Sequence, residues 1–326
     1  MFMPPRTRAV VLLLAALALV PAAGPAQAPA ASGLRFSAHA VIEAAPVHYA
    51  IRHHSAADPE VRNGAIPALY GPDGSIADLA GHAETQALKH SLAHPDLRII
   101  LTITEGHYRI IAKRSAGIRS MADLRGKRVA AVPDSSAAYY LDRALAVAGL
   151  SERDIALVPV PLPPRDAARL LLDGRADALA LWDPEPEIAL AALGKDAIIF
   201  DPDTGYRELY NLHSTAAKLA DPATRAKIVR FVARLIEASA TLRDKPEPAI
   251  ALAATVTGYP ASSIRRAWPM HAFPAALSPG LLETLVSEEV WLAAQEGRKA
   301  RSRADLAVLI DPTIEAEARA WLRERK

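Results

Sequence analysis

The sequence has no cysteine at any of its 326 positions. This absence excludes disulfides, thiolate metal sites, a cysteine nucleophile and a lipid anchor attached to an N-terminal cysteine. An excess of charge of one sign is lacking as well, because 38 lysines and arginines oppose 36 aspartates and glutamates. Two of the basic residues, Arg6 and Arg8, lie in an N-terminal segment that we expect to be removed, which leaves no net charge. We therefore do not expect a nucleic-acid partner, because such binding depends on counterion release by a basic surface.

Residues 1–28 have the pattern of an export signal. The basic residues are followed by an apolar run from Ala9 to Val20 and by small residues that end in Ala26-Gln27-Ala28. The apolar run has about 12 residues, whereas a membrane-spanning helix needs about 20. We predict a cleaved signal peptide over residues 1–28 and a periplasmic mature chain that is not inserted in the membrane.

The rest of the chain has a globular composition, with 51% hydrophobic and 23% charged residues. Between residues 122 and 200 a strand followed by a helix recurs three times, which is typical of a mainly parallel sheet with right-handed crossovers. We expect strands at 128–132, 155–160, 176–182 and 197–200, and helices that begin near Asp134, Pro164 and Asp183.

The flanking segments differ from this block. Before it, we expect strands at 34–43, 76–80, 97–104 and 108–112, helices at 46–54 and 83–94, and no regular structure over 55–75. After Thr215 only helices are expected, at 221–243, 248–255, 261–268, 279–296 and 311–323.

The predicted fold class is therefore α/β, with two lobes that are each a mainly parallel sheet flanked by helices, and with a helical C-terminal part. Lobe 1 would be discontinuous, over 33–107 and 213–326, and lobe 2 would be 108–212. The chain would cross between the lobes at hinges near 105–111 and 206–215.

Candidate ligand contacts follow the ends of the predicted strands, where helix N-termini present unpaired N–H groups. Ser135 and Ser136 offer two hydroxyls at such a helix start and suit an anionic head group, although Asp134 or Ser135 could equally be only a helix cap. Trp182 either stacks on a planar or apolar ligand or closes the core of its lobe.

A second group of candidates follows the strand expected at 76–80. His82 and Thr85 can donate hydrogen bonds, whereas an ionised Glu84 can only accept them. Whether Glu84 faces the cleft or solvent stays open at this point. If it faces the cleft, a bare anion such as nitrate is disfavoured as the ligand.

Catalytic motifs are lacking. The sequence has no G-x-S-x-G, no glycine-rich phosphate loop, no dinucleotide fingerprint and no H-E-x-x-H. His90 and His94 have a spacing that suits a metal, but a pair without a nearby third ligand is more often a solvated helix face. We expect no catalytic residue, no metal and no cofactor.

Several segments taken together resemble the periplasmic solute-binding proteins of ABC importers. The nearest branch is the nitrate, sulfonate and taurine group, which also includes binders of thiamine-pyrimidine precursors. The resemblance covers most of residues 76–255. It is carried by Asp123-Leu124-Arg125-Gly126-Lys127-Arg128-Val129, Ser135-Ser136-Ala137 with Tyr140-Leu141, Gly174-Arg175-Ala176-Asp177-Ala178, Trp182-Asp183-Pro184 and the run Asp221 to Ala253.

The resemblance implies a type II periplasmic-binding-protein fold that closes on a small ligand and presents the closed form to an ABC permease in the inner membrane. We expect the ligand to be a small organic acid or a sulfonate-like solute, and the protein to be a monomer. On matching positions the ligand contacts would be Pro46, His48, His82, Glu84, Thr85, Ser135, Ser136, Trp182 and Asp183.

Two other functions remain open from the sequence. One is an enzyme on the same scaffold, active in thiamine-pyrimidine or related precursor chemistry, for which His48 or His82 is the best candidate residue. The other is a sensor that passes the closed state to a membrane receptor. Turnover of a bound ligand would distinguish the enzyme, but the sequence does not separate the importer from the sensor.

Overall fold

The computed structural model describes residues 33–54, 60–71 and 77–325. The predicted signal peptide, residues 1–28, lies outside the described residues. Among the residues that are described, no helix is both long enough and apolar enough to cross a membrane.

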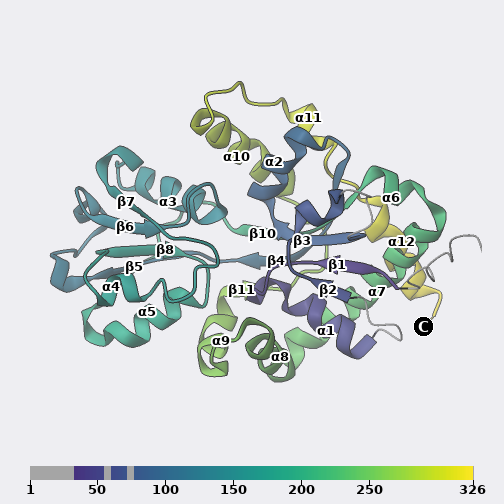
Figure 1. The fold of residues 1–326 in the computed structure, drawn as a ribbon, viewed down its shortest axis with the longest axis horizontal. Coiled ribbons are helices and arrows are strands. Elements are labelled where there is room, and N and C mark those ends of the chain that lie inside the picture. The colour runs from purple at the N-terminus through teal and green to yellow at the C-terminus, as the bar shows by residue number, and fades with distance from the viewer. Residues whose placement is uncertain (1–32, 55–59, 72–76, 326) are drawn as a thin grey trace, which may run out of the picture. The chain divides into compact units, whose positions relative to one another are not determined.

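One sheet has six strands in the order β11-β4-β10-β3-β1-β2 (Figure 1). Strand β1 is a parallel neighbour of β2 and β3, whereas β10 is antiparallel to both β3 and β4, and β11 is antiparallel to β4. Strands β1 to β4 therefore run in one direction and β10 and β11 in the other. The strands are β1 (Arg35–Ser37), β2 (Glu60–Arg62), β3 (Leu79–Ala83), β4 (Leu97–Gly106), β10 (Glu208–Thr215) and β11 (His271–Ala272).

The second sheet has five strands in the order β7-β6-β8-β5-β9. Strand β6 is parallel to β7 and β8, and β5 is antiparallel to β8 and β9. As predicted, most strands of each sheet run in one direction. The strands are β5 (Arg109–Lys113), β6 (Arg128–Ala131), β7 (Ala156–Pro159), β8 (Ala178–Leu181) and β9 (Ala197–Phe200).

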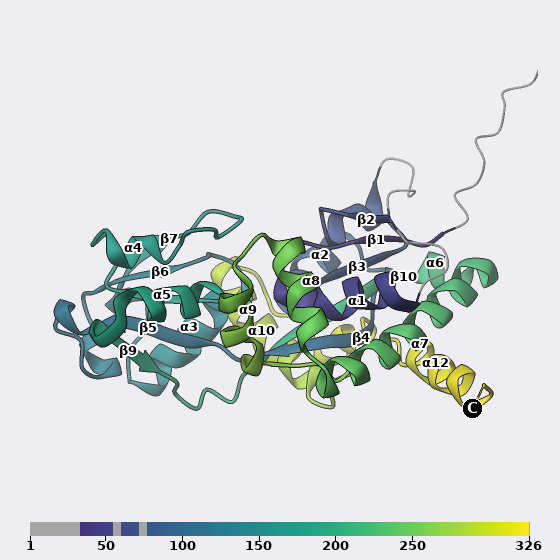
Figure 2. The same cartoon turned by 90° about the horizontal axis from the view of Figure 1, so that it is seen from below.

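Helices cover both faces of the six-stranded sheet (Figures 1 and 2). On one face, α1 (Ala45–His54), α7 (Pro222–Asp244) and α12 (Thr313–Arg323) pack in a core that includes Phe36 and Leu212. On the other face, α2 (Glu84–Ala93), α10 (Leu281–Gln295) and α11 (Arg303–Ala307) pack in a core that includes Ile99 and Leu209. The remaining helices of this part are α6 (Ala216–Ala220), α8 (Glu247–Thr257) and α9 (Ala261–Ala267).

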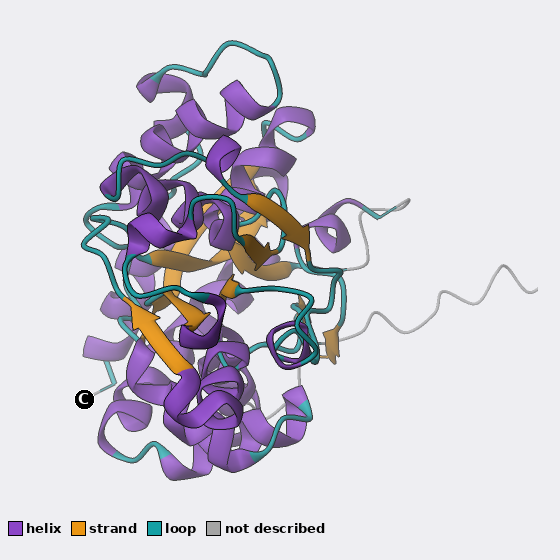
Figure 3. Cartoon of the chain, turned by 90° about the vertical axis from the view of Figure 1, so that its left-hand side faces the viewer, coloured by secondary structure: helices purple, strands orange, loops and turns teal. Residues whose placement is uncertain are grey.

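The five-stranded sheet has a separate core, built from residues between Tyr108 and Tyr206. Helices surround its strands, as Figure 3 shows by colour. They are α3 (Ser136–Val147), α4 (Arg169–Leu172) and α5 (Glu185–Leu193).

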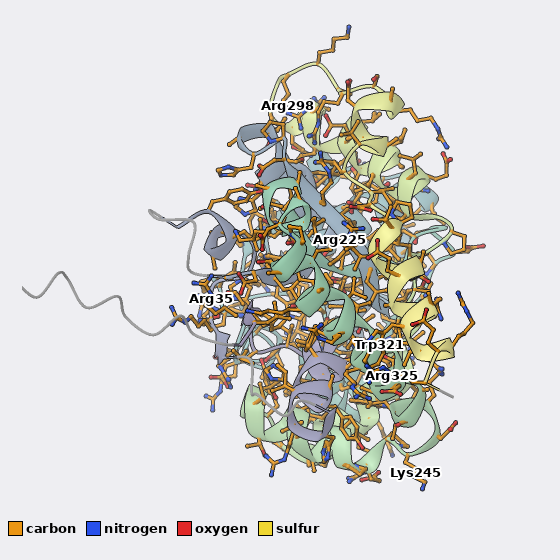
Figure 4. The ribbon with its side chains drawn as sticks, turned by 90° about the vertical axis from the view of Figure 1, so that its right-hand side faces the viewer. Arg35, Arg225, Lys245, Arg298, Trp321 and Arg325 are labelled. Atoms are coloured by element: carbon orange, nitrogen blue, oxygen red, sulfur yellow. The ribbon has the colours of Figure 1, made fainter. Side chains whose placement is uncertain are left out.

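The C-terminal helix is fastened to α7 by polar contacts as well as by the core. Nε of Arg225, on α7, lies 3.2 Å from both carboxylate oxygens of Glu317 on α12. The guanidinium of Arg234 lies over the ring of Trp321 at 5.2 Å. Figure 4 labels Arg225 and Trp321 on these two helices. The helical tail therefore covers a sheet that earlier residues have already formed, as the sequence predicts.

Some predicted elements are displaced. The strand expected at 76–80 is β3, which extends to Ala83, so α2 begins at Glu84. This shift arises because β10 pairs with β3 as far as Ala83, and β10 itself occupies most of the segment expected only as a crossing. The prediction of no strand after Thr215 is wrong as well, since the short β11 pairs with the edge of β4.

Other differences are local. The expected strand 34–43 is only Arg35–Ser37, because its pairing with β2 covers three residues. The segment 55–75, expected to be irregular, contains β2 and a 3-10 helix over Ile66–Tyr70 in its described part. The helix expected from Pro164 begins at Arg169, because Asp166 has a φ of 62° in the left-handed region, which a right-handed helix does not accept.

Candidate functional site

Buried polar side chains gather where the chain passes from one sheet to the other. Tyr108 follows β4, and Glu208 begins β10, which returns to the six-stranded sheet. Glu43 acts electrostatically on both of them, and also on Tyr210 and His271. We call these five residues, Glu43, Tyr108, Glu208, Tyr210 and His271, the junction cluster.

Strand register explains how two members of the cluster meet. Gly106, at the end of β4, is in register with His271 of β11 on one side and with Glu208 of β10 on the other. Cross-strand partners point to the same face of a sheet. The side chains of His271 and Glu208 therefore lie on either side of Gly106, which has no side chain of its own. A Cβ on Gly106 would lie 2.6 Å from Oε2 of Glu208. The glycine therefore lets the carboxyl group lie over β4.

Glu43 lies in a 3-10 helix, Ile42–Ala44, just before α1. Its carbonyl oxygen accepts a hydrogen bond of 2.7 Å from the Thr104 hydroxyl, which fixes this turn to β4. Its carboxylate oxygen Oε1 lies 3.9 Å from Nε2 of His271, whose Nδ1 lies 3.1 Å from the carbonyl oxygen of Ala267. Burial lowers the pKa of His271, but the carboxylates of Glu43 and Asp183 outweigh it and raise that pKa. Protonation of His271 would therefore be favoured by the Glu43 carboxylate beside it.

Glu208 is 5% exposed and occupies the centre of the cluster. Burial raises the pKa of Glu208 well above its usual value, and the nearby carboxyl groups of Glu43 and Glu84 raise it further. A hydrogen bond from Tyr108 acts in the opposite direction but is weaker. The Tyr108 hydroxyl also lies 2.9 Å from Oγ of Ser136 at the start of α3. The cluster thus reaches from the six-stranded sheet to a helix of the other sheet.

The two serines predicted as ligand contacts have different surroundings. The Ser135 hydroxyl donates to the carbonyl of Val132 at 2.8 Å and accepts from the backbone N–H of Ala138 at 3.4 Å, so it caps α3. Ser136 instead contacts Tyr108 and therefore adjoins the junction cluster. The helix-cap interpretation holds for Ser135, and the structure brings Ser136 next to the cluster.

Trp182 and Asp183 follow β8, as predicted. Trp182 is half-buried and packs against the core of the five-stranded sheet. Asp183 is buried and accepts two hydrogen bonds from Nη2 of Arg109, at 3.1 and 3.2 Å, while Nη1 of Arg109 donates to Glu187 at 2.8 Å. Burial raises the pKa of Asp183 to about 6, although His271 and Arg109 act in the opposite direction. Asp183 therefore lies beside the cluster with an ionic partner of its own.

Glu84 and Thr85 are buried at the start of α2. The Glu84 carboxyl accepts a hydrogen bond from the Tyr206 hydroxyl and another, of 2.8 Å, from the backbone N–H of Leu209. Burial raises the pKa of Glu84 to about 7 in spite of these bonds. The Thr85 hydroxyl donates to Glu288 on α10 at 3.0 Å. Glu84 therefore does not face open solvent, and it binds the segment that leads into β10.

His82 lies on the other face of the six-stranded sheet from Tyr210. It is in register with Asn211, whereas Tyr210 is in register with Ala83, and successive residues of a strand point to opposite faces. Its Nδ1 accepts a hydrogen bond of 2.9 Å from the backbone N–H of Ala83. Burial, with three neighbouring histidines, holds the pKa of His82 well below its usual value, so the ring is neutral.

Pro46 and His48 lie in the first turn of α1, directly after Glu43. Pro46 is buried and His48 is half-buried. Burial lowers the pKa of His48, and its Nε2 has no hydrogen-bond partner among the described residues. The imidazole of His48 therefore lies close in sequence to Glu43, a member of the junction cluster.

All five members of the cluster are absent from the residues predicted as ligand contacts. Glu43 falls inside the strand expected at 34–43, and Glu208 falls inside a segment expected as a crossing. His271 belongs to a strand of two residues, which no hydrophobic pattern reveals. The pairing of β10 and β11 with β4, together with the hydrogen bond from Thr104 to Glu43, brings them together. Within the part of the chain that is described, no group of three or more acidic or histidine side chains is arranged to hold a metal.

A family model described as NMT1/THI5 like matches residues 75–249, which is more than half of the chain. A curated relative from Escherichia coli (strain K12), named as an aliphatic sulfonates-binding protein, is 34% identical over 170 residues. This match covers 52% of the chain and 51% of the relative, so it spans about half the length of the curated relative.

Two solved structures share the fold. The alkanesulfonate-binding protein SsuA from Xanthomonas axonopodis pv. citri, bound to MOPS, has a TM-score of 0.66 at 24% identity, over 86% of this chain and 98% of that one. The periplasmic aliphatic sulphonate binding protein SsuA from Escherichia coli has a TM-score of 0.71 at 21% identity, over 86% and 92%. The predicted α/β periplasmic-binding-protein fold is thereby confirmed.

Proposed function

Because the chain belongs to the NMT1/THI5-like family, we propose that it is the substrate-binding component of an ABC uptake system, which captures a small solute and delivers it to a permease. Membership of the family confirms the resemblance that the sequence segments predict. The observation that carries the proposal is the family match together with a cluster of buried polar groups at the junction of the two sheets.

The capture step requires two lobes that close on the solute. As the sequence predicts, we assign residues 33–107 and 213–326 to one lobe and 108–212 to the other, except that the whole of β10 goes with the first lobe because it pairs with β3 and β4. The separate cores of the two sheets support this division. Because β10 begins at Glu208 and pairs along its whole length, the second hinge would lie before β10 rather than within it.

Closure would form contacts between the proposed lobes. The Gln86 side chain on α2 donates to the carbonyl of Asp134, before α3, at 2.9 Å. The hydroxyls of Tyr139 on α3 and Ser287 on α10 lie 2.6 Å apart. Opening the hinges would break both contacts, so this arrangement represents the closed form in the proposal.

The solute would be a small organic acid or a sulfonate-like compound, since the curated relative is named for aliphatic sulfonates. Its acid group would meet the N-terminus of α3 at Ser136, where the helix presents N–H groups and a partial positive charge. The half-buried ring of Trp182 would support the body of the solute. Asp183, Glu84 and Thr85 have protein partners, and in this proposal they hold the walls of the site rather than the solute.

The relatives named above are binding proteins. In this proposal the protein accordingly retains its ligand without turnover, acts as a monomer and works in the periplasm after loss of residues 1–28. A sensor would use the same capture step, and it would differ only in handing the closed form to a receptor instead of a permease.

A thermal-shift screen of residues 29–326 against sulfonates, carboxylates, nitrate and pyrimidines tests the proposal. A ligand at 100 times its Kd adds about 2.7 kcal/mol to the free energy of unfolding. At about 2 to 4 °C per kcal/mol, Tm should rise by roughly 5 to 11 °C. The ligand should be recovered unchanged after incubation. Conversion of the ligand to another compound contradicts the proposed function. It is contradicted as well if no compound raises Tm and the denatured protein releases no small molecule.

A further inference from the structure

The junction cluster contains more acidic than basic groups. The guanidinium of Arg109 is engaged by Asp183 and Glu187, and the ring of His271 pairs with Glu43. Glu208 is different, because no basic side chain among the described residues contributes to its electrostatic surroundings. One buried carboxyl group therefore lacks a compensating charge.

Three buried polar atoms of the cluster also lack a hydrogen-bond partner among the described residues. They are Oε2 of Glu43, Oε2 of Glu208 and the hydroxyl of Tyr210. Their side chains belong to residues that are only 2%, 5% and 4% exposed, respectively. A buried acceptor without a donor is costly, so such atoms in a binding site are the natural partners of a ligand.

Two glycines leave room for the Glu208 and Tyr210 side chains. Gly106 lets the Glu208 carboxyl lie over β4, and a Cβ on Gly81 would lie 2.8 Å from the Tyr210 oxygen. Glu208 and Tyr210 lie two residues apart on β10 and therefore share a face. Glu43 acts electrostatically on both of them, and Glu208 acts on Tyr210. The free acceptors thus belong to one built site.

We infer that this site holds the solute by a protonated nitrogen, an ammonium or amidinium group, placed between Glu43 and Glu208 with the Tyr210 hydroxyl beside it. The inference rests on the proposed function and narrows its ligand class. An ammonium group supplies three donors and a positive charge, and the cluster offers carboxylate acceptors and lacks that charge. A ligand without such a nitrogen would leave Oε2 of Glu43 and Oε2 of Glu208 without a hydrogen-bond donor.

Matched ligand pairs test the inference directly. Each pair has the same size, and only one member carries the nitrogen: 3-aminopropanesulfonate and butanesulfonate, β-alanine and butyrate, and benzylammonium and benzyl alcohol. In calorimetric titrations we expect the nitrogen-bearing member of at least one pair to bind at least tenfold more tightly than its partner. Equal or tighter binding of the nitrogen-free members overturns the inference while the proposed function stands. If no probe binds and denaturation releases no small molecule, both fail.

Two variants locate the nitrogen. Glu208→Gln and Glu43→Gln keep the size of the side chain and remove a carboxyl group that could ionise beside a bound cation, so each should weaken the nitrogen-bearing probe at least tenfold and leave the nitrogen-free probe unchanged. Glu288→Gln is the matched control, because Glu288 is equally buried but lies on α10 and accepts its bond from Thr85. Unchanged affinity in Glu208→Gln and Glu43→Gln overturns the assignment.

A stability measurement separates a binding role from a structural one. In the absence of ligand, Glu208→Gln should unfold at the same or a higher temperature than the parent at pH 7.5, because it removes a buried carboxyl group that has no cationic partner. A variant that loses both stability and affinity would show that Glu208 supports the fold instead, and it would contradict the inference.

Discussion

Replacing Glu84 by glutamine should change how stability depends on pH. The pKa of Glu84 is raised from 4.5 to about 7 in the folded protein, because the carboxyl group is buried at the start of α2. Between these two values the folded state holds a proton that the unfolded state has lost. The contribution of Glu84 to stability is therefore complete below pH 4.5, and it is lost as the pH rises through about 7.

The magnitude follows from the shift. One pKa unit corresponds to about 1.4 kcal/mol, so a shift of this size changes the free energy of unfolding by about 3 kcal/mol across the interval. Other buried groups titrate in the same range, and His213, with a pKa lowered by burial to about 3, acts in the opposite direction. The difference between the parent and Glu84→Gln cancels these other contributions, provided that their surroundings are unchanged.

Urea unfolding of both proteins at intervals between pH 4.5 and 8.5 measures this difference. The variant should gain about 3 kcal/mol relative to the parent as the pH rises to about 7, and the difference should then level off. Glu237→Gln, at a half-exposed position on α7, is the control for the same substitution outside the buried core. A constant difference for Glu84→Gln would refute the reasoning that burial controls this carboxyl group.

Three further substitutions test the fold around the site. Gly106→Ala should be destabilising because its Cβ would meet the Glu208 carboxyl group. In a double-mutant cycle, adding Glu208→Ala should recover about 0.5 to 3 kcal/mol of the lost free energy of unfolding. Purely additive losses would contradict the close approach of these two residues. Arg109→Met should cost about 3 to 5 kcal/mol in urea unfolding, because it leaves the buried Asp183 without its partner, and a loss below about 1 kcal/mol would count against the pair. Asp221→Ala should cost about 1 kcal/mol through loss of the α7 cap, and Asp221→Asn should restore most of it.

Elements with strong local signals could be predicted from the sequence alone. The Asp221 cap and the proline at the next position predict the start of α7, and the structure begins this helix at Pro222. The alternation of strands and helices between residues 128 and 200 likewise predicts β6 to β9 to within two residues at each end. In both cases the interactions that define the element lie within a few residues of it, so the local pattern contains them.

The candidate site was only partly predictable for the opposite reason. Parallel strand ends and helix starts predict Ser136 and Asp183 as candidate contacts, because that rule depends on the order of elements, and the structure brings both next to the junction cluster. Glu208 gave no such signal, since its burial depends on β10 pairing with β4, a segment about 100 residues earlier in the chain. The sequence also left open whether Glu84 faces the cleft. The pairing of β10 with β3 brings the backbone N–H of Leu209 to the Glu84 carboxyl group, which is buried there.

The sequence by itself therefore determined the family, the fold class and most of the helices, because local caps, periodicity and short motifs encode them. Only the tertiary structure decided which acidic groups meet. Nothing next to Gly106 in the sequence shows what it will contact, and it matters because β10 and β11 place Glu208 and His271 on either side of it. Charge and burial at the junction are properties of segments distant in sequence, so they emerge only when long-range strand pairing fixes the register.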